Sequence, residues 1–174
     1  MKPTQFKPLC ENDIDLLYHW FQEPIIKQWY AKDKHWTIED IKQKYLPRIQ
    51  AKDKVYSFIV HRNDHPIGFI QYYYLMDHLP EGIQANDNPL FKRYHPNEII
   101  GVDIFIAHNQ DRGKGLGTEI INCFIFELQL NIKAVVVDPN STHTQAIRCY
   151  EKAGFKTSTY SDNPNNLIMI KTLD

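Results

Sequence analysis

Residues 111–118, DRGKGLGT, contain three of the chain's seven glycines and lie between an apolar stretch and a helical one. A glycine-rich turn between a strand and a helix leaves several backbone N–H groups directed into one concavity, next to the positive end of the helix dipole. Phosphate oxygens bind there without interference from side chains. The stretch is therefore predicted to hold an anion, although tight packing at a helix start also favours glycine.

The spacing of these glycines excludes the two commonest nucleotide-binding loops. A P-loop follows GxxxxGK with Ser or Thr, whereas Lys114 lies between two glycines here. A dinucleotide-binding turn has the pattern GxGxxG, whereas Gly113, Gly115 and Gly117 follow GxGxG. Neither familiar loop accounts for this turn.

A single carboxylate interrupts the apolar run before the turn. Asp103 lies within IIGVDIFIA, residues 99–107. A carboxylate in a central strand is costly to bury unless another group pairs with it. Two explanations stay open at this point: a structural partner, such as an Arg or a backbone cap, and a function in chemistry.

The elements that must position these residues are those of a βαβ unit. Residues 98–108 predict a strand, residues 117–130 a helix and residues 133–138 a second strand. Such a crossover implies parallel strands joined by the helix. Another helix is predicted at 142–153, and Gly154 lies at the position that ends it.

The rest of the chain adds helices and hairpins to this unit. Helices are predicted after Asn12 and after Thr37, where Thr37 and Asp40 resemble a capping box, and Pro47 is expected to kink or end the second helix. Further strands are predicted at 4–9, 55–61, 66–75, 155–161 and 167–173. These elements predict one α/β domain over residues 1–174, with a mixed central sheet of about seven strands flanked by about four helices.

The segment 77–97, DHLPEGIQANDNPLFKRYHPN, breaks all periodicity. It is predicted as a loop of about twenty residues, and a loop that long in a compact domain is functional or disordered. Asp77, Glu81 and Asp87 would attract a cation, but ordinary solvation beside Lys92 and Arg93 explains them equally well.

Composition excludes several classes of partner. The formal net charge is −1 and no block of like charges occurs, so nothing favours nucleic acid or an anionic membrane. Cys10, Cys123 and Cys149 lie far apart, and His61 and His65 flank a turn without a third ligand, so no disulfide frame or metal site is predicted. No apolar run reaches the about 18 residues of a membrane span, and a cytoplasmic protein is expected.

Two segments together resemble the signature of the Gcn5-related N-acetyltransferases (GNAT superfamily). Its pattern, Arg/Gln-x-x-Gly-x-Gly, is matched by Arg112, Gly115 and Gly117, and AIRCYEKAGF at 146–155 matches its helix that carries Tyr and ends in Gly-Phe. Within the superfamily the chain resembles the aminoglycoside 6′-N-acetyltransferases. The matching segments are QWY at 28–30, KYLP at 44–47, PIGFIQYYY at 66–74, GVDIFIA at 101–107, GKGLGT at 113–118 and VDP at 137–139.

The resemblance implies a GNAT fold and direct transfer of an acetyl group from acetyl-CoA to a primary amine, with the 6′-amine of an aminoglycoside as the expected acceptor. The alternatives are the same chemistry on another small amine, such as a siderophore precursor, a polyamine or an amino acid, and a non-catalytic coenzyme-A-binding module. No metal is implied, and a monomer or a homodimer is expected.

The resemblance also implies roles for individual residues. Tyr150 stands where the superfamily has the Tyr that protonates the leaving thiolate, and His143 stands where it often has Asn. Residues implied to bind acetyl-CoA are Ile104, Phe105, Ile106, Arg112, Gly113, Lys114, Gly115, Leu116, Gly117, Thr118 and His143. Residues implied to bind the acceptor are Trp29, Tyr30, Gln71, Tyr73, Asp103 and Asp138.

Asp103 is predicted to face the acceptor amine. An ordinary Asp carboxyl has a pKa of about 3.9, so as a base at neutral pH it is mismatched by roughly 4 kcal/mol. Holding the substrate's ammonium and passing its proton to water is an equally good role. Base and anchor therefore both stay open.

Overall fold

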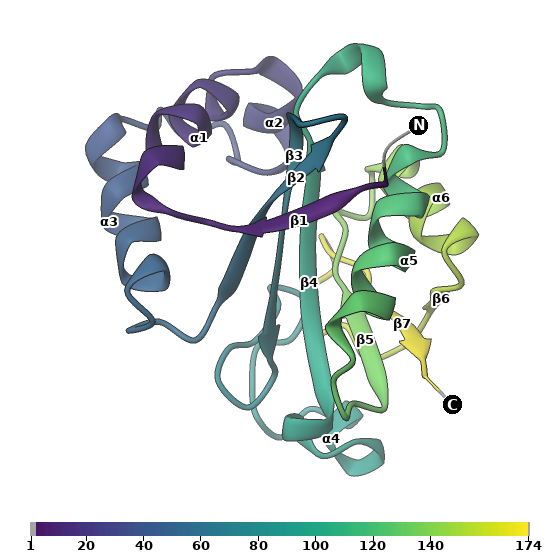
Figure 1. Ribbon diagram of the computed structural model, residues 1–174. Coiled ribbons are helices and arrows are strands. Elements are labelled where there is room, and N and C mark those ends of the chain that lie inside the picture. The colour runs from purple at the N-terminus through teal and green to yellow at the C-terminus, as the bar shows by residue number, and fades with distance from the viewer. Residues whose placement is uncertain (1–2, 174) are drawn as a thin grey trace. The chain divides into compact units, whose positions relative to one another are not determined.

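A seven-stranded mixed sheet forms the framework of the protein in a computed structural model that describes residues 3–173 (Figure 1). Residues 1, 2 and 174, which the one-domain prediction includes, lie outside the described residues. The strand order is β1-β2-β3-β4-β5-β7-β6. The strands are β1 (Gln5–Pro8), β2 (Tyr56–Arg62), β3 (His65–Tyr74), β4 (Ile99–Ile106), β5 (Ala134–Val137), β6 (Lys156–Thr157) and β7 (Met169–Thr172).

The four predicted helices are present, and two short ones are additional. The helices are α1 (Ile14–Phe21), α2 (Pro24–Trp29), α3 (Ile38–Ile49), α4 (Leu90–Arg93), α5 (Leu116–Leu128) and α6 (Thr144–Lys152). Short 3₁₀ turns occur at Glu11–Asp13, Pro96–Glu98 and Asn109–Asp111. The additional helices, α2 and α4, are too short for an apolar periodicity to reveal them. Within residues 3–173, no helix combines the length and apolar character that crossing a bilayer requires.

The chain divides into two compact units, each built from two segments. The first comprises the residues up to Gln71 together with Ile104–Arg112, and the second comprises Tyr72–Asp103 together with the residues from Gly113 onward. Two of the three divisions fall inside strands, between Gln71 and Tyr72 in β3 and between Asp103 and Ile104 in β4, and the third falls between Arg112 and Gly113 in the glycine-rich turn. This explains why no change in composition marks them in the sequence.

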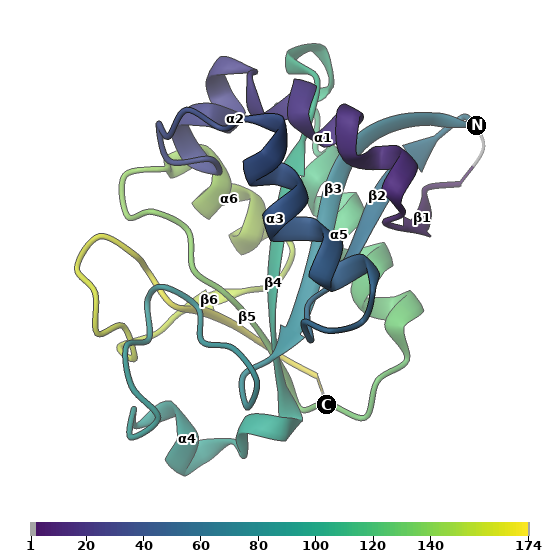
Figure 2. The ribbon, with the colours of Figure 1, turned by 90° about the vertical axis from the view of Figure 1, so that its left-hand side faces the viewer.

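In the first unit, helices α1 and α3 lie side by side (Figure 2). The start of α3 is fixed by the predicted capping box, in which the Asp40 amide donates to Thr37 Oγ1 at 3.1 Å and the Thr37 amide donates to Asp40 Oδ2 at 2.9 Å. Pro47 lies in the last turn of this helix, which ends at Ile49. Strands β2 and β3 form the predicted hairpin, and Asn63 and Asp64 both have the positive φ that a two-residue turn requires.

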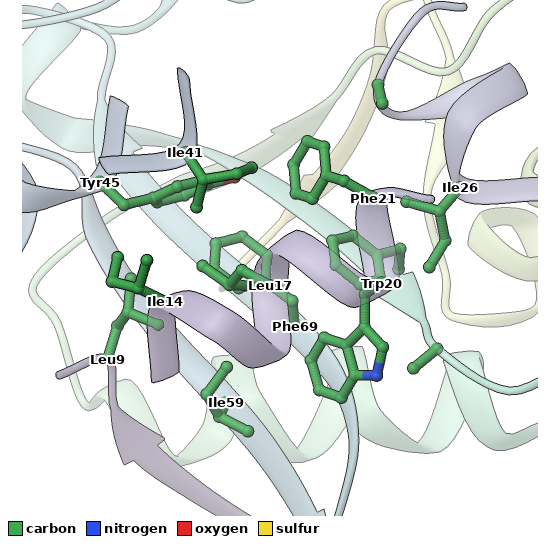
Figure 3. Close-up of a cluster of buried hydrophobic side chains, with 13 residues drawn as sticks. Leu9, Ile14, Leu17, Trp20, Phe21, Ile26, Ile41, Tyr45, Ile59 and Phe69 are labelled. Atoms are coloured by element: carbon green, nitrogen blue, oxygen red, sulfur yellow. The ribbon is translucent and has the colours of Figure 1, made fainter. Parts of the chain in front are cut away.

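The core of the first unit is aromatic. Phe69 and Phe105 stack with ring centroids 5.4 Å apart, and the edges of Trp20 and Phe21 contact the Phe105 ring. Figure 3 shows Leu17, Phe21 and Tyr45 converging on Phe69. A β-carbon at Gly68 would lie 2.5 Å from the Phe105 carbonyl oxygen, so glycine permits the close approach of β3 to β4 here.

The second unit contains the predicted βαβ crossover. Strands β4 and β5 are parallel, with Ile99 opposite Ala134 and Gly101 opposite Val136, and α5 connects them. All four residues of β5 are buried, as is usual for a central parallel strand. Strand β7 pairs antiparallel with β5, and α5 and α6 lie side by side (Figure 1).

Most of segment 77–97 has no regular secondary structure, in line with the predicted loop, but the segment is folded. It contains α4 and a 3₁₀ turn, and its residues Ile83, Asn88 and Leu90 are almost completely buried. The strand predicted at 155–161 is also shorter than expected, because only Lys156 and Thr157 pair with β7.

Candidate functional site

The glycine turn has the geometry of an anion cradle. Gly113 and Gly115 have φ values of +75° and +82°, a conformation that side-chain-bearing residues rarely adopt, and Gly115 is the N-cap of α5. The first amide of the helix ladder is that of Glu119, which donates to the Gly115 carbonyl at 3.1 Å. The amides of Leu116, Gly117 and Thr118 precede this ladder at the positive end of the helix dipole, where an anion binds.

The guanidinium of Arg112 binds the backbone of its own strand end. Its Nε and Nη2 donate to the carbonyl oxygen of Ile106 at 3.0 and 2.7 Å, and Nη2 also donates to that of Ala107 at 2.9 Å. Burial lowers the pKa of this guanidinium, an effect that the Glu23 carboxylate opposes. The side chain therefore braces the chain entering the glycine turn, whereas Lys114 is exposed.

The hydroxyl of Thr118 links the start of α5 to α6. It donates to the carbonyl oxygen of Cys149 at 3.2 Å, one residue before Tyr150. At the C-terminal end of α6, the Lys171 ammonium donates to the carbonyl oxygen of Ala153 at 2.7 Å and to Asn122 Oδ1 at 2.6 Å. Gly154, with φ +93°, ends the helix as predicted. These bonds hold the C-terminal half of α6, which carries Tyr150.

Tyr150 is buried, with 8% of its surface exposed. Its ring packs edge-on against Phe155, with centroids 5.7 Å apart. Burial raises the pKa of its hydroxyl well above the ordinary value, and the negative charges of Asp103 and Asp138 raise it further. The hydroxyl therefore stays protonated at neutral pH, as a proton donor must.

Asp103, in β4, and Asp138, directly after β5, occupy equivalent positions relative to the parallel pairing of these strands. Each lies two residues beyond the last β4–β5 pair, Gly101 and Val136, so in extended backbone both side chains leave the same face of the sheet. Both are half-buried, and both charges act on the hydroxyl of Tyr150. The structure thus brings two predicted acceptor carboxylates and the predicted acid together.

Tyr73 lies on the same face. A β-carbon added to Gly101 would be 2.4 Å from Tyr73 Cζ, so the tyrosine ring covers this glycine, two residues before Asp103. Tyr73 is 7% exposed, and its ring also contacts that of His78 edge-on at 6.0 Å. Glycine at 101 is what leaves room for the ring beside the carboxylate.

The carboxylate of Asp138 is also tied to segment 77–97. Its Oδ2 accepts the amide of Gly82 at 3.3 Å, and its carbonyl oxygen accepts Nδ2 of Asn166 at 2.9 Å. Asp138 is therefore more than a turn residue before Pro139, because it joins two loop segments at the end of β5.

The remaining predicted residues lie in the first unit or at the start of α6. Gln71 is buried, and its Oε1 accepts from Arg48 at 2.7 Å and from Ser57 at 3.2 Å, which favours a structural role. Tyr30 packs on Phe105 with centroids 4.8 Å apart. Trp29 and the strand residues Ile104 and Ile106 are half-buried, and Phe105 belongs to the aromatic core.

His143 is the N-cap residue of α6 and is half-buried. Burial lowers the pKa of its imidazole, so the ring is neutral near pH 7 and offers hydrogen bonds without charge. Across residues 3–173, no group of His, Cys, Asp and Glu side chains is arranged to hold a metal ion.

Comparison with known proteins decides the family. Residues 10–162 match the Acetyltransferase (GNAT) domain family. The chain belongs to this family. The turn at 113–118 and Tyr150 thus lie in a GNAT acetyltransferase, as their spacing indicated, and the seven-stranded sheet is the fold of that family.

Several relatives of this GNAT acetyltransferase are named as aminoglycoside acetyltransferases. An aminoglycoside N(6′)-acetyltransferase type 1 from Klebsiella pneumoniae is 31% identical over 163 residues, which are 90% of this chain and 77% of the relative. A solved structure of AAC(6′)-Ib in complex with acetyl-CoA and paromomycin has a TM-score of 0.80 at 28% identity and covers 98% of this chain and 94% of that one. A structure of AAC(6′)-Ib with coenzyme A and kanamycin has a TM-score of 0.78 at 29% identity, covering 98% and 95%.

Sequence reasoning missed several residues that shape this acetyltransferase site. Gly82, Asn88 and Asp162 hold the segments that reach Asp138, and Gly101 admits Tyr73. The Asn-Pro pairs at 88–89 and 163–164 are turn signals, but they do not tell which distant segment each turn contacts.

Proposed function

We propose that this GNAT acetyltransferase transfers the acetyl group of acetyl-CoA directly to the 6′-amine of an aminoglycoside. The observation that carries the proposal is the cluster of Asp103, Asp138 and Tyr150 in the same unit as the glycine turn. The named relatives and the solved complexes with aminoglycosides support this choice of acceptor.

The residues of the turn fit the donor. Acetyl-CoA supplies an acetyl thioester and carries a pyrophosphate, and the amides of Leu116, Gly117 and Thr118 are disposed to bind phosphate oxygens. The space beside Gly115 is open, since a β-carbon added there would have no heavy atom within 4 Å, and this agrees with such a ligand. His143, at the start of α6, is proposed to offer a neutral hydrogen-bonding group to the same donor.

Each polar side chain of the cluster has a proposed task. Asp103 either accepts a proton from the acceptor's ammonium or holds the ammonium while that proton passes to water, and loss of the proton makes the nitrogen lone pair available for attack. The Tyr150 hydroxyl gives its proton to the departing sulfur and regains one from solvent. Asp138 holds a second cationic group of the acceptor. Tyr73 offers its ring as an apolar wall, and Trp29 and Tyr30 remain proposed acceptor residues.

Arg112→Ala is expected to raise the Kd for coenzyme A about tenfold, because the turn loses charge-assisted hydrogen bonds that each stabilise it by roughly 1.5–3 kcal/mol. Arg112→Gln should recover most of the affinity, since an amide can still donate to the Ile106 carbonyl. Isothermal titration calorimetry measures both. The Lys114→Ala variant removes an exposed charge and serves as the comparison. If Arg112→Gln binds coenzyme A as weakly as Arg112→Ala does, and Lys114→Ala also weakens binding, then Arg112 acts through its charge. That result would refute the bracing role.

The proposed function is tested by thiol release from acetyl-CoA across a panel of amines. We expect turnover with aminoglycosides that carry a 6′-amine, such as kanamycin, and none with a derivative whose 6′-amine is replaced by hydroxyl. Turnover confined to polyamines, amino acids or siderophore precursors would keep the chemistry and reject the acceptor. Coenzyme A binding without turnover of any amine would reject the enzyme.

The cysteines support a reducing compartment. Cys10, Cys123 and Cys149 are all free thiols, and burial raises the pKa of Cys123 and of Cys149, which disfavours their reactive thiolates. We therefore place the reaction in the cytoplasm.

A further inference from the structure

Segment 77–97 is fastened to the turn at 160–163, far away in the sequence. The Asp162 amide donates to the carbonyl oxygen of Gly82 at 2.8 Å, and Asp162 Oδ2 accepts the amide of Gln84 at 3.2 Å and Nδ2 of Asn88 at 2.8 Å. Asn88 Nδ2 also donates to the carbonyl oxygen of Tyr160 at 2.8 Å. We call the pair Asn88 and Asp162 the latch.

Asn88 gives the latch a single arrangement. It is 3% exposed, its Nδ2 donates twice, and its Oδ1 accepts the amide of Leu90 at 2.9 Å. A buried amide whose donors and acceptor are all used specifies one geometry, because any displacement leaves a polar group unsatisfied. Asp162, in contrast, is an exposed residue, so its side chain can be replaced without leaving a cavity in the core.

The latch reaches the acceptor carboxylate through Gly82. The Gly82 carbonyl accepts the backbone amide of Asp162, the Asp162 side chain holds the Gln84 amide two residues further along, and the Gly82 amide donates to Asp138 Oδ2 at 3.3 Å. A β-carbon at Gly82 would lie 2.5 Å from Cδ1 of Ile168, so this backbone is also pressed against the segment before β7. Gly82 thus transmits the position of the latch to Asp138.

We propose that Asn88 and Asp162 are positioning residues that set specificity for the acceptor, because they fix the Gly82 amide and with it the orientation of the Asp138 carboxylate. The proposal rests on the proposed function, in which Asp138 holds a cationic group of the acceptor. Asp162 acts through its hydrogen-bond geometry and not through its charge. This distinguishes it from a carboxylate that contacts the substrate.

A pair of substitutions at Asp162 separates geometry from charge. Asp162→Ala removes the carboxylate oxygens together with the charge, whereas Asp162→Asn removes the charge but keeps an oxygen that accepts from Gln84 and Asn88. The backbone bond from Asp162 to the Gly82 carbonyl remains in both variants. We expect Ala to raise KM for the acceptor about tenfold, with kcat and KM for acetyl-CoA within about twofold of wild type. Asn should stay within about threefold of wild type. Asp87→Asn, which removes an exposed charge of the same segment, should change nothing.

Hydrogen exchange gives a readout that is independent of activity. The amides of residues 82–88 should exchange faster in the Ala variant and not in the Asn variant, because only Ala releases the latch. Equal KM increases for Asn and Ala would show that the charge matters and overturn the proposal. A fall in kcat accompanied by equal rises in the KM values of both substrates would overturn it as well. Unchanged hydrogen exchange in the Ala variant would have the same consequence.

Failure of the proposed function would appear separately, in the wild-type enzyme. If the wild type acetylates another amine and no aminoglycoside, the acceptor assignment fails, and the comparison of KM for that other amine still decides the positioning role. If it acetylates no amine, both the function and the positioning role are rejected.

Discussion

Asp103→Asn lowers kcat/KM for a cationic amine by at least about a hundredfold, the expected result for a carboxylate that faces the reacting nitrogen. Asn has nearly the same shape, so the half-buried position at the end of the β4–β5 pairing should keep its packing. The affinity for coenzyme A should not change, because the amides of the glycine turn lie on another element.

The distribution of the loss between kcat and KM separates the two roles of Asp103. A base lost from the reaction lowers kcat, whereas an ammonium anchor lost from the complex chiefly raises KM for the acceptor. Steady-state kinetics over the concentrations of both substrates gives this division. A variant whose kcat/KM stays within a few-fold of wild type would refute both roles.

Tyr150→Phe is expected to lower kcat about a hundredfold or more, which is typical for loss of a general acid. Phe retains the ring that packs against Phe155, so the melting temperature and both KM values should change little. Tyr94→Phe, at another buried tyrosine, is the matched control and should retain wild-type kcat. Full kcat in the Tyr150 variant would show that solvent or another group protonates the thiolate.

The pH dependence of kcat follows from the environment of Tyr150. Burial and the nearby negative charges raise its pKa, which favours the protonated, proton-donating form. An ordinary tyrosine ionises at about pH 10, so the Tyr150 hydroxyl should remain protonated throughout the range below that pH. A loss of kcat between pH 8 and pH 10 that is absent from the Phe variant would contradict this assignment.

Segment 77–97 marks the limit of sequence reasoning. Its prolines, glycine and asparagines indicate turns correctly, but they do not reveal that Asn88 and Ile83 are buried. What orders the segment is its set of bonds to residues 160–163, which are about seventy positions away. Local periodicity contains no information about such a partner.

The sequence by itself determined the family, the glycine turn and the proposed acid. Gly113 and Gly115 are required by their positive φ, and Gly154 ends α6 for the same reason, so these residue types specify backbone locally. These glycines are readable because they depend on neighbours in sequence. Tyr150 lies beyond α5 and β5, and it was identified by the order and spacing of the two family motifs.

Only the tertiary structure decided how these pieces meet. Strand register places Asp103 and Asp138 on one face, Gly101 admits the ring of Tyr73, and Arg112 braces its own strand end. Each arrangement depends on strand pairing or packing, whose energies come from contacts between segments that the chain brings together only on folding. A carboxylate in an apolar run can be noticed in the sequence, but its partners become known only when the sheet is assembled.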